Sequence, residues 1–378
     1  MTADRRQTTN ADESGGATPA PALRRGWTTG ACATAATKAG LTALLTGAFP
    51  DPVEILLPKG ETPAFSLARQ RLHDGIAMAS IIKDAGDDPD VTHLAEIVAR
   101  IRFGKPDSGI VFRAGKGVGM DTLIGLPIPP GEPAINPVPR ALMRAVVEDL
   151  CRTHGRAADV EIEIGVTDGE ALAQKTWNPR LGIVGGLSIL GTTGIVHPFS
   201  CAAWIHSIHR GVDVARGAGL GHVVGATGSS SEDAARALYP ELPEIAFLDM
   251  GDFAGGLLKY LRAHPVPRLT LAGGFAKLTK LGAGSLDLHS GRSQVDHDFL
   301  LELVRGLDPA SADSLGPDIL SANTAKAVLD LCSAEGIDLA SAVAAAALAT
   351  IKATLRSADI AAEVIVVDRS GGVIARAH

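Results

Sequence analysis

Apolar and polar positions alternate in the first half of the chain, and this pattern predicts strands. Val160, Ile162 and Ile164 alternate with glutamates, which is typical of a half-buried strand over 159–166. Other strands are predicted over 52–58, 64–72, 75–83 and 109–113, and the second and third of these flank a hairpin-like turn. Helices are predicted over 31–45 and 140–153. This mixture predicts an α+β domain.

The pattern changes to an alternation of strands and helices after about residue 200. Helices are predicted over 201–216, 234–238 and 253–263, and strands over 220–224, 244–249 and 268–272. This order predicts a Rossmann-like parallel sheet that binds ligands at the carboxyl ends of its strands. Two more helices, over 323–334 and 340–356, precede a hairpin within 364–375.

These patterns divide the chain into four segments. We expect a disordered tail over 1–22, because that stretch is polar and rich in glycine and proline. An α+β domain with glycine-rich substrate loops follows over 23–200, and a Rossmann-like α/β domain over 201–310. Residues 311–378 are expected to form C-terminal helices and a terminal hairpin that pack on the preceding domains.

The run from Leu181 to Val196 is uncharged, yet it contains five glycines. A membrane-spanning helix, a tight structural crossover and a ligand-facing loop are three interpretations of such a run. Glycine weakens regular helices and strands, so the loop interpretation is favoured. The glycines would let backbone approach a ligand, while Ser188, Thr192 and Thr193 supply hydroxyl groups.

Composition limits the class of partner. The net charge of −7 argues against a nucleic-acid-binding protein, although a local basic cluster could still bind a small anion. The sequence shows no leader pattern, so a cytoplasmic protein without a membrane partner is expected, and a homo-oligomer is left open. The four cysteines are far apart, which favours free thiols. His197, His206 and His209 lack a zinc pattern and are interpreted as surface residues, so no protein metal site is expected.

Three segments carry candidate chemistry. Residues 225–228 lie between a predicted strand and a predicted helix, where backbone amides suit an anion or a ribose, and Asp249 follows the next strand. The alternative for residues 225–228 is a plain turn, and the alternative for Asp249 is a helix cap. The carboxylates of 84–90 are interpreted either as a solvated turn or as groups that handle a proton. Mutual repulsion would raise their pKa values, which suits the second interpretation. Residues 26–35 place amides and hydroxyls at a helix start, or simply cap that helix.

Four long motifs, in order, resemble the CbiD family. They cover residues 27–36, 83–92, 131–140 and 178–194, and the resemblance extends more loosely over nearly everything after residue 22. It implies methyl transfer from S-adenosylmethionine to ring carbon C-1 of cobalt-precorrin-5B, a cobalt-containing corrinoid, in cobalamin biosynthesis. It also implies two domains, one α+β and one Rossmann-like. Any cobalt would arrive within the substrate.

Roles for individual residues are then inferred from chemistry. The sulfonium donor needs mainly alignment and exclusion of water, so the site is a set of positioning groups. We expect the donor at Gly225, Thr227, Gly228, Asp249 and Gly251. A ring proton would be managed by Asp84, Asp87 or Asp88. The macrocycle would contact Thr28, Thr29, Arg140, Lys175, Arg180, Gly185, Gly186, Thr192 and Thr193, the basic residues pairing with its carboxylates in a localised basic pocket.

Two other functions remain open from the residues alone. A small-molecule kinase would also use glycine-rich loops, but no P-loop is present. A non-catalytic tetrapyrrole carrier would bind the macrocycle without affinity for a methyl donor.

Overall fold

A five-stranded, mostly antiparallel sheet forms the centre of the first domain. The computed structural model describes residues 23–378, so the expected tail over 1–22 lies outside the described residues. The strand order is β4-β5-β6-β10-β7, and only β10 and β7 run parallel. The strands are β4 (Arg69–His73), β5 (Ile76–Ile82), β6 (Glu96–Phe103), β7 (Ile110–Ala114) and β10 (Val160–Val166).

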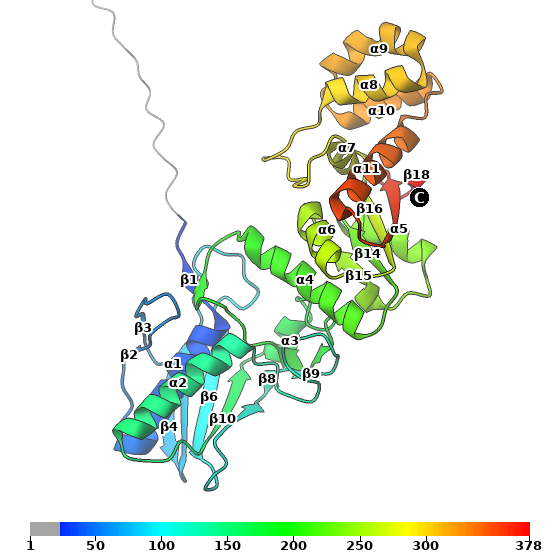
Figure 1. Cartoon of the computed structure of the whole chain (residues 1–378). Helices are drawn as coiled ribbons and strands as arrows, with labels where there is room; N and C mark the ends of the chain where they lie inside the picture. The colour runs from blue at the N-terminus through cyan, green and yellow to red at the C-terminus, as the bar shows by residue number, and fades with distance from the viewer. Residues whose placement is uncertain (1–22) are drawn as a thin grey trace, which may run out of the picture.

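Helices α1 (Thr29–Thr46) and α2 (Pro137–Thr153) cover one face of this sheet (Figure 1). The small residues of α1 allow close packing, and a Cβ on Gly40 would lie 2.9 Å from Cγ1 of Ile101. On the other face, glutamates of β10 pair with arginines of β6, including Arg100 with Glu163 at 2.7 Å. The predicted alternation of β10 is therefore confirmed, with the aliphatic side chains facing the helices.

Short strand pairs and one short helix join the remaining loops. The uncharged run 181–196 contains three two-residue strands, in agreement with the loop interpretation. The strand predicted over 52–58 is wrong in length, because the strand itself covers Val53–Glu54, although Ile55 and Leu57 still donate to the carbonyls of Pro63 and Glu61. The pairs are β1 (Gly26–Trp27) with β13 (Ile195–Val196), β2 (Val53–Glu54) with β3 (Ala64–Phe65), β8 (Gly117–Val118) with β12 (Gly186–Leu187) and β9 (Met120–Asp121) with β11 (Ile183–Val184), and the helix is α3 (Gly169–Ala173).

The second domain contains the expected parallel sheet. Its order is β15-β14-β16-β17-β18, and the first four strands run parallel while β18 returns antiparallel. The terminal hairpin is thus part of the sheet, because β17 pairs directly with β16. The strands are β14 (His222–Ala226), β15 (Phe247–Asp249), β16 (Arg268–Gly274), β17 (Ala361–Val367) and β18 (Val373–Ala377).

Helices cover both faces of the second sheet. One face packs against α5 (Ser229–Leu238), and the other against α4 (Cys201–Gly217), α6 (Ala254–Ala263), α7 (Phe275–Gly282) and α11 (Leu339–Leu355). A short 3₁₀ turn, Glu244–Ala246, leads into β15. Helices α8 (His297–Leu307), α9 (Pro309–Ser321) and α10 (Ala325–Ala334) form a group at the end of the molecule far from the first domain (Figure 1).

The fold is therefore α+β followed by α/β, in two domains, with α4 lying between them (Figure 1). Over residues 23–378, the helices are too short or too polar for any to traverse a bilayer.

Candidate functional site

The four sequence motifs meet around the start of α1. Backbone N–H groups of Thr28 and Gly30 donate to the carbonyls of Gly194 and Leu190, both at 2.9 Å. Thr28 caps α1 through its hydroxyl, and the Thr29 hydroxyl accepts a hydrogen bond from Leu190 N at 2.9 Å. These contacts fix the glycine-rich loop against the helix. Both threonine hydroxyls accept hydrogen bonds from the protein itself, and their contact with a substrate remains a prediction.

Four of the five glycines in the uncharged run are needed by the protein's own packing. A Cβ on Gly186 would lie 2.3 Å from the carbonyl oxygen of Gly117, and one on Gly191 would lie 2.3 Å from the Thr28 hydroxyl. Leu123 and Leu57 fill the corresponding space at Gly182 and Gly194. The interpretation that these glycines exist to admit a ligand is therefore wrong at those four positions.

Gly185 is different, because a Cβ there would meet no atom of residues 23–378 within 4 Å. It has a φ of +87° and is exposed beside Val184. Thr192 is also exposed, whereas the Thr193 hydroxyl accepts a hydrogen bond from Ile195 N at 3.2 Å. Open backbone for a ligand is thus limited to a small part of the run.

Each candidate carboxylate of the acidic loop has a partner. Asp84 pairs with the guanidinium of Arg24, which holds the pKa of that carboxyl below its usual value. The raised pKa expected from mutual repulsion is therefore wrong for Asp84. Asp87 accepts from Arg24 N at 2.6 Å, and Asp88 accepts from Phe199 N at 2.8 Å. The loop connects the start of the first domain to the segment that enters α4.

The basic residues are dispersed and mostly paired. Arg140 donates to the carbonyl of Ile135 at 2.8 Å and lies 3.2 Å from Glu132 Oε2. Arg180 pairs with Glu232 of the second domain at 2.9 Å, and Lys175 is exposed. Two of the three expected substrate cations thus contact acidic side chains, which argues against the localised basic pocket that was predicted.

Sequence reasoning missed Asp121, which is buried at 2% exposure. Within residues 23–378 its Oδ1 has no hydrogen-bond partner. Burial raises the pKa of its carboxyl to about 6, and the nearby Arg140 opposes this shift. The signal available in the sequence was an acidic residue in the glycine- and proline-rich stretch that precedes the third motif.

The predicted donor residues collect at the carboxyl edge of the second sheet, with one exception. Thr227 and Gly228 follow β14, and Asp249 ends β15 opposite Ala226. In the described part of the chain, Gly228 precedes α5 without a side-chain cap, and a Cβ there would meet no atom within 4 Å. Gly225 lies inside β14, where Leu257 fills the space of its missing side chain, so its geometry gives it a packing role.

Several side chains surround this edge. Asp249 is half-buried, which raises the pKa of its carboxyl, and its Oδ1 accepts from Gly251 N at 3.2 Å. Lys277 of α7 donates to the Thr227 carbonyl at 2.7 Å and lies 3.0 Å from Asp252. Asp249, Asp252 and Lys277 thus form a partly polar rim around the open positions at Gly228 and Gly274.

Trp204 of α4 also contacts this rim. Its indole N–H donates to the carbonyl oxygen of Asp249 at 3.3 Å.

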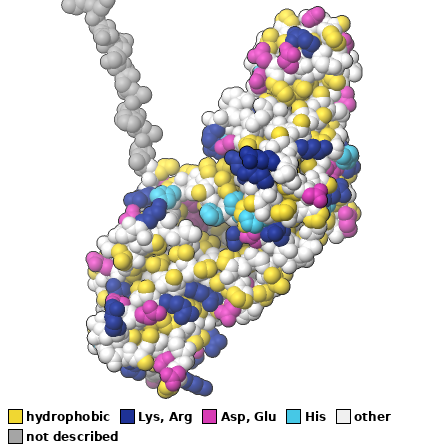
Figure 2. Space-filling model, in the orientation of Figure 1, with side chains coloured by type: hydrophobic (Ala, Val, Ile, Leu, Met, Phe, Trp, Pro, Cys, Tyr) yellow, Lys and Arg dark blue, Asp and Glu magenta, His cyan; other side chains and the backbone are white. Residues whose placement is uncertain are grey.

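Figure 2 shows histidine side chains on the surface where the two domains meet. His197, which precedes α4, and His206 within α4 are both exposed. Within residues 23–378, no three side chains of the types that ligate metals are grouped closely enough to hold an ion.

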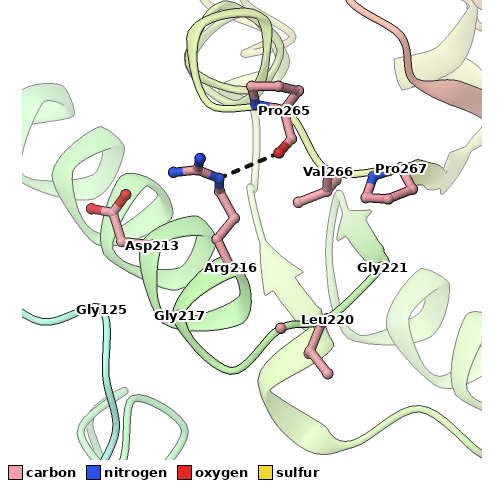
Figure 3. Close-up of a pocket in the computed structure, with 10 residues that line it drawn as sticks. Gly125, Asp213, Arg216, Gly217, Leu220, Gly221, Pro265, Val266 and Pro267 are labelled. Carbon is pink, nitrogen blue, oxygen red and sulfur yellow. Dashed lines mark hydrogen bonds between the residues drawn. The ribbon is translucent and has the colours of Figure 1, made fainter.

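A shallow pocket of about 570 Å³ lies at the opposite edge of the second sheet. Gly221 and Pro267 line it, and they precede β14 and β16, so it faces the amino ends of the strands. Arg216 crosses it to the carbonyl of Pro265 at 3.3 Å (Figure 3). Ligands of parallel sheets bind at the carboxyl ends, so this pocket is a poor candidate for the donor site.

Comparison with known proteins identifies relatives over nearly the whole chain. The family model CbiD matches residues 17–198, and the model described as CbiD, C-terminal domain matches residues 287–378. The cobalt-precorrin-5B C(1)-methyltransferase of Brucella anthropi is 64% identical over 94% of this chain and 95% of its own. That of Brucella canis is 63% identical with the same coverage. A crystal structure of the cobalamin biosynthesis protein (cbiD) from Archaeoglobus fulgidus matches 71% of this chain and 83% of that chain, with 29% identity and a TM-score of 0.40.

Proposed function

This chain belongs to the CbiD family, and on that premise we propose that it methylates ring carbon C-1 of cobalt-precorrin-5B with S-adenosylmethionine as donor. The product would be cobalt-precorrin-6A. The observation that carries the proposal is the 64% identity to a protein of that name over 94% of the chain. A match of this length spans both domains and the segment between them.

The carboxyl edge of the second sheet fits the donor. As far as residues 23–378 are concerned, Gly228 and Gly274 leave open space at the starts of α5 and α7, and both helices begin without a side-chain cap. Uncapped helix starts offer backbone N–H groups to oxygen atoms. Within residues 23–378, the Asp249 carboxylate accepts a single hydrogen bond, from Gly251 N, so acceptor capacity remains for ribose hydroxyls.

The donor supplies an electrophilic methyl group whose leaving group is a neutral thioether. The protein's task is therefore to align this methyl with the ring carbon and to exclude water, and alignment alone can supply roughly 7–11 kcal/mol. Asp249, Thr227 and Gly228 would orient the donor at the sheet edge. Gly185 and Thr192 of the first domain would contact the macrocycle, with Lys175 as an exposed cation for its carboxylates.

The decisive experiment is a methylation assay with the full chain. Protein, S-adenosylmethionine with a deuterated methyl group and cobalt-precorrin-5B are incubated without oxygen. The corrinoid is then examined by mass spectrometry and NMR. We expect a gain of one labelled methyl group, located at C-1. A corrinoid that keeps its mass would contradict the proposal.

Calorimetry separates the proposal from the two alternatives. The proposed enzyme binds S-adenosylhomocysteine and the corrinoid. A tetrapyrrole carrier binds only the corrinoid, and a kinase binds ATP with magnesium. Binding of ATP but not S-adenosylhomocysteine would favour the kinase.

A further inference from the structure

Two exposed aromatic side chains mark the point where the chain passes from the first domain into α4. Phe199 is 67% exposed and Trp204 is 44% exposed. Aromatic residues make up only 4% of the chain, so two exposed ones within six positions are not explained by composition. Cys201, Ala202 and Ala203 between them are exposed as well. The first turn of α4 therefore presents an apolar surface between the two domains.

Trp204 is anchored through its indole N–H, and the residue is 44% exposed. Its indole N–H is held by the carbonyl of Asp249, and its ring atoms would lie 3.5 Å from a Cβ built on Gly251. The positive φ of Gly251, +54°, and its lack of a side chain bring the backbone against the indole. These contacts fix the ring directly beside the residues that we assign to the donor.

Phe199 is fixed from the opposite domain. Its backbone N–H donates to Asp88 of the acidic loop at 2.8 Å, and its φ is +55°, which is unusual for a bulky residue. Local strain of this kind persists only where surrounding contacts impose it. The acidic loop and the sheet edge thus hold one aromatic residue each, on either side of an exposed helix start.

We propose that Trp204 is a substrate-contacting, specificity-determining residue whose indole face stacks on the conjugated macrocycle and places it next to the donor. The proposal rests on the proposed function. A flat conjugated ring is the chemistry that an exposed indole face recognises by offset stacking. The contact with Asp249 and Gly251 supplies the reason why the occupant is the methyl acceptor: a ring on this surface lies beside the donor edge. Phe199 extends the same surface.

The test uses three variants of the full chain. Trp204→Ala removes the stacking face, Trp204→Phe keeps an aromatic face without the N–H, and Leu307→Ala changes an exposed side chain of α8, 50% exposed, at the far end of the molecule. Cobalt-precorrin-5B is titrated into each protein without donor and followed by its visible absorbance. S-adenosylhomocysteine is titrated separately by calorimetry. Melting curves establish that each variant is folded.

We expect Trp204→Ala to weaken corrinoid binding about tenfold, and Trp204→Phe to stay within about threefold of wild type. Leu307→Ala should leave binding unchanged. S-adenosylhomocysteine affinity should be retained in all three, because the Trp204 hydrogen bond goes to the Asp249 carbonyl, whereas the group assigned to the donor is the carboxylate. In turnover assays, Trp204→Ala should raise KM for the corrinoid more than it lowers kcat.

Unchanged corrinoid affinity in Trp204→Ala would overturn the proposal, even if the wild type methylates its substrate normally. Equal loss of both ligands would also overturn it, since it would indicate a distorted sheet edge. If Trp204→Ala instead changes only the oligomeric state, measured by sedimentation, the surface is an interface between copies of the chain and the inference is wrong. Absence of methylation by the wild type tests the proposed function separately.

Discussion

Arg180 of the first domain forms a two-pronged ion pair with Glu232 of the second domain, with Nη2 to Oε1 at 2.9 Å and Nη1 to Oε2 at 3.1 Å. The Glu232 side chain is only 9% exposed, so the pair is partly withdrawn from water. Arg180 also lies 3.3 Å from Glu244. A residue that was expected to bind the substrate therefore holds the two domains together.

Breaking this pair should weaken the contact between domains. We expect Arg180→Ala to lower the free energy of unfolding by about 1–3 kcal/mol, because it leaves a buried carboxylate with fewer partners. A double-mutant cycle with Glu232→Gln, followed by urea denaturation, should give a coupling energy of at least about 1 kcal/mol. Additive effects would show that the pair contributes nothing. If Arg180→Ala instead raises only KM for the corrinoid, the substrate role predicted from the sequence is favoured.

Asp121 should make stability depend on pH in an unusual direction. Its folded pKa of about 6 lies above the ordinary value of 3.8, so the native state binds the extra proton and loses stability as pH rises between these values. The cost above pH 6 is about 3 kcal/mol. We expect Asp121→Asn to stabilise the protein at pH 8 and to have a smaller effect, about 1 kcal/mol, near pH 4.5, as measured by urea denaturation at both values.

Asp84 provides a control for that measurement, because its pKa is shifted in the opposite direction. Its pKa is lowered by Arg24, so its contribution is present above its unfolded pKa and is lost as pH falls through its folded pKa. Asp84→Asn should therefore reduce stability slightly at pH 8, since the pair is largely exposed. Equal pH profiles for the two variants would contradict our description of Asp121.

Neighbouring glycines should respond differently to substitution. Gly186→Ala places a Cβ 2.3 Å from the Gly117 carbonyl, and we expect a loss of about 3 kcal/mol or a failure to accumulate folded protein. Gly185→Ala meets no atom of the described residues within 4 Å but must adopt a positive φ, which costs about 1–2 kcal/mol. Thermal melts measure both effects. Reduced corrinoid affinity in folded Gly185→Ala would support its substrate role, whereas equal stability of the two variants would contradict the packing described here.

The two edges of the second sheet should be distinguishable by ligand binding. Asp249→Asn should weaken S-adenosylhomocysteine binding about 10- to 100-fold by calorimetry, because a charged acceptor for ribose hydroxyls is lost. Arg216→Ala, in the pocket at the amino edge, should leave that affinity unchanged. The reverse result would move the donor site to the amino edge.

Regular elements with a clear period could be predicted from the sequence. The alternation in β10 and the strand–helix order of the second domain were recognised because each depends on near neighbours in the chain. Strand β6 was missed although Ile97, Ala99 and Ile101 alternate, so its signal was available. Helix α9 contains Pro317 and Gly316, which obscure its pattern, and the two-residue strands have no period at all.

The chemistry of individual side chains could not be predicted, because it depends on distant partners. Asp84 is paired with Arg24, sixty positions away, and this reverses the direction of its pKa shift. Four of the five glycines of the uncharged run were correctly associated with close approach, but the approaching atoms belong to the protein. The glycines in a sequence indicate where the backbone is closely approached. They do not indicate whether the approaching atoms belong to the protein or to a ligand.

The position of β17 has a consequence for biogenesis. Its partner β16 ends at Gly274, whereas β17 begins only at Ala361, after five intervening helices. While the ribosome is still producing those helices, one side of β16 has no neighbouring strand to pair with. Strands with an unpaired side are prone to aggregation. Slower synthesis or a cooler culture should therefore change the soluble yield of this protein more than that of one whose sheet closes in chain order.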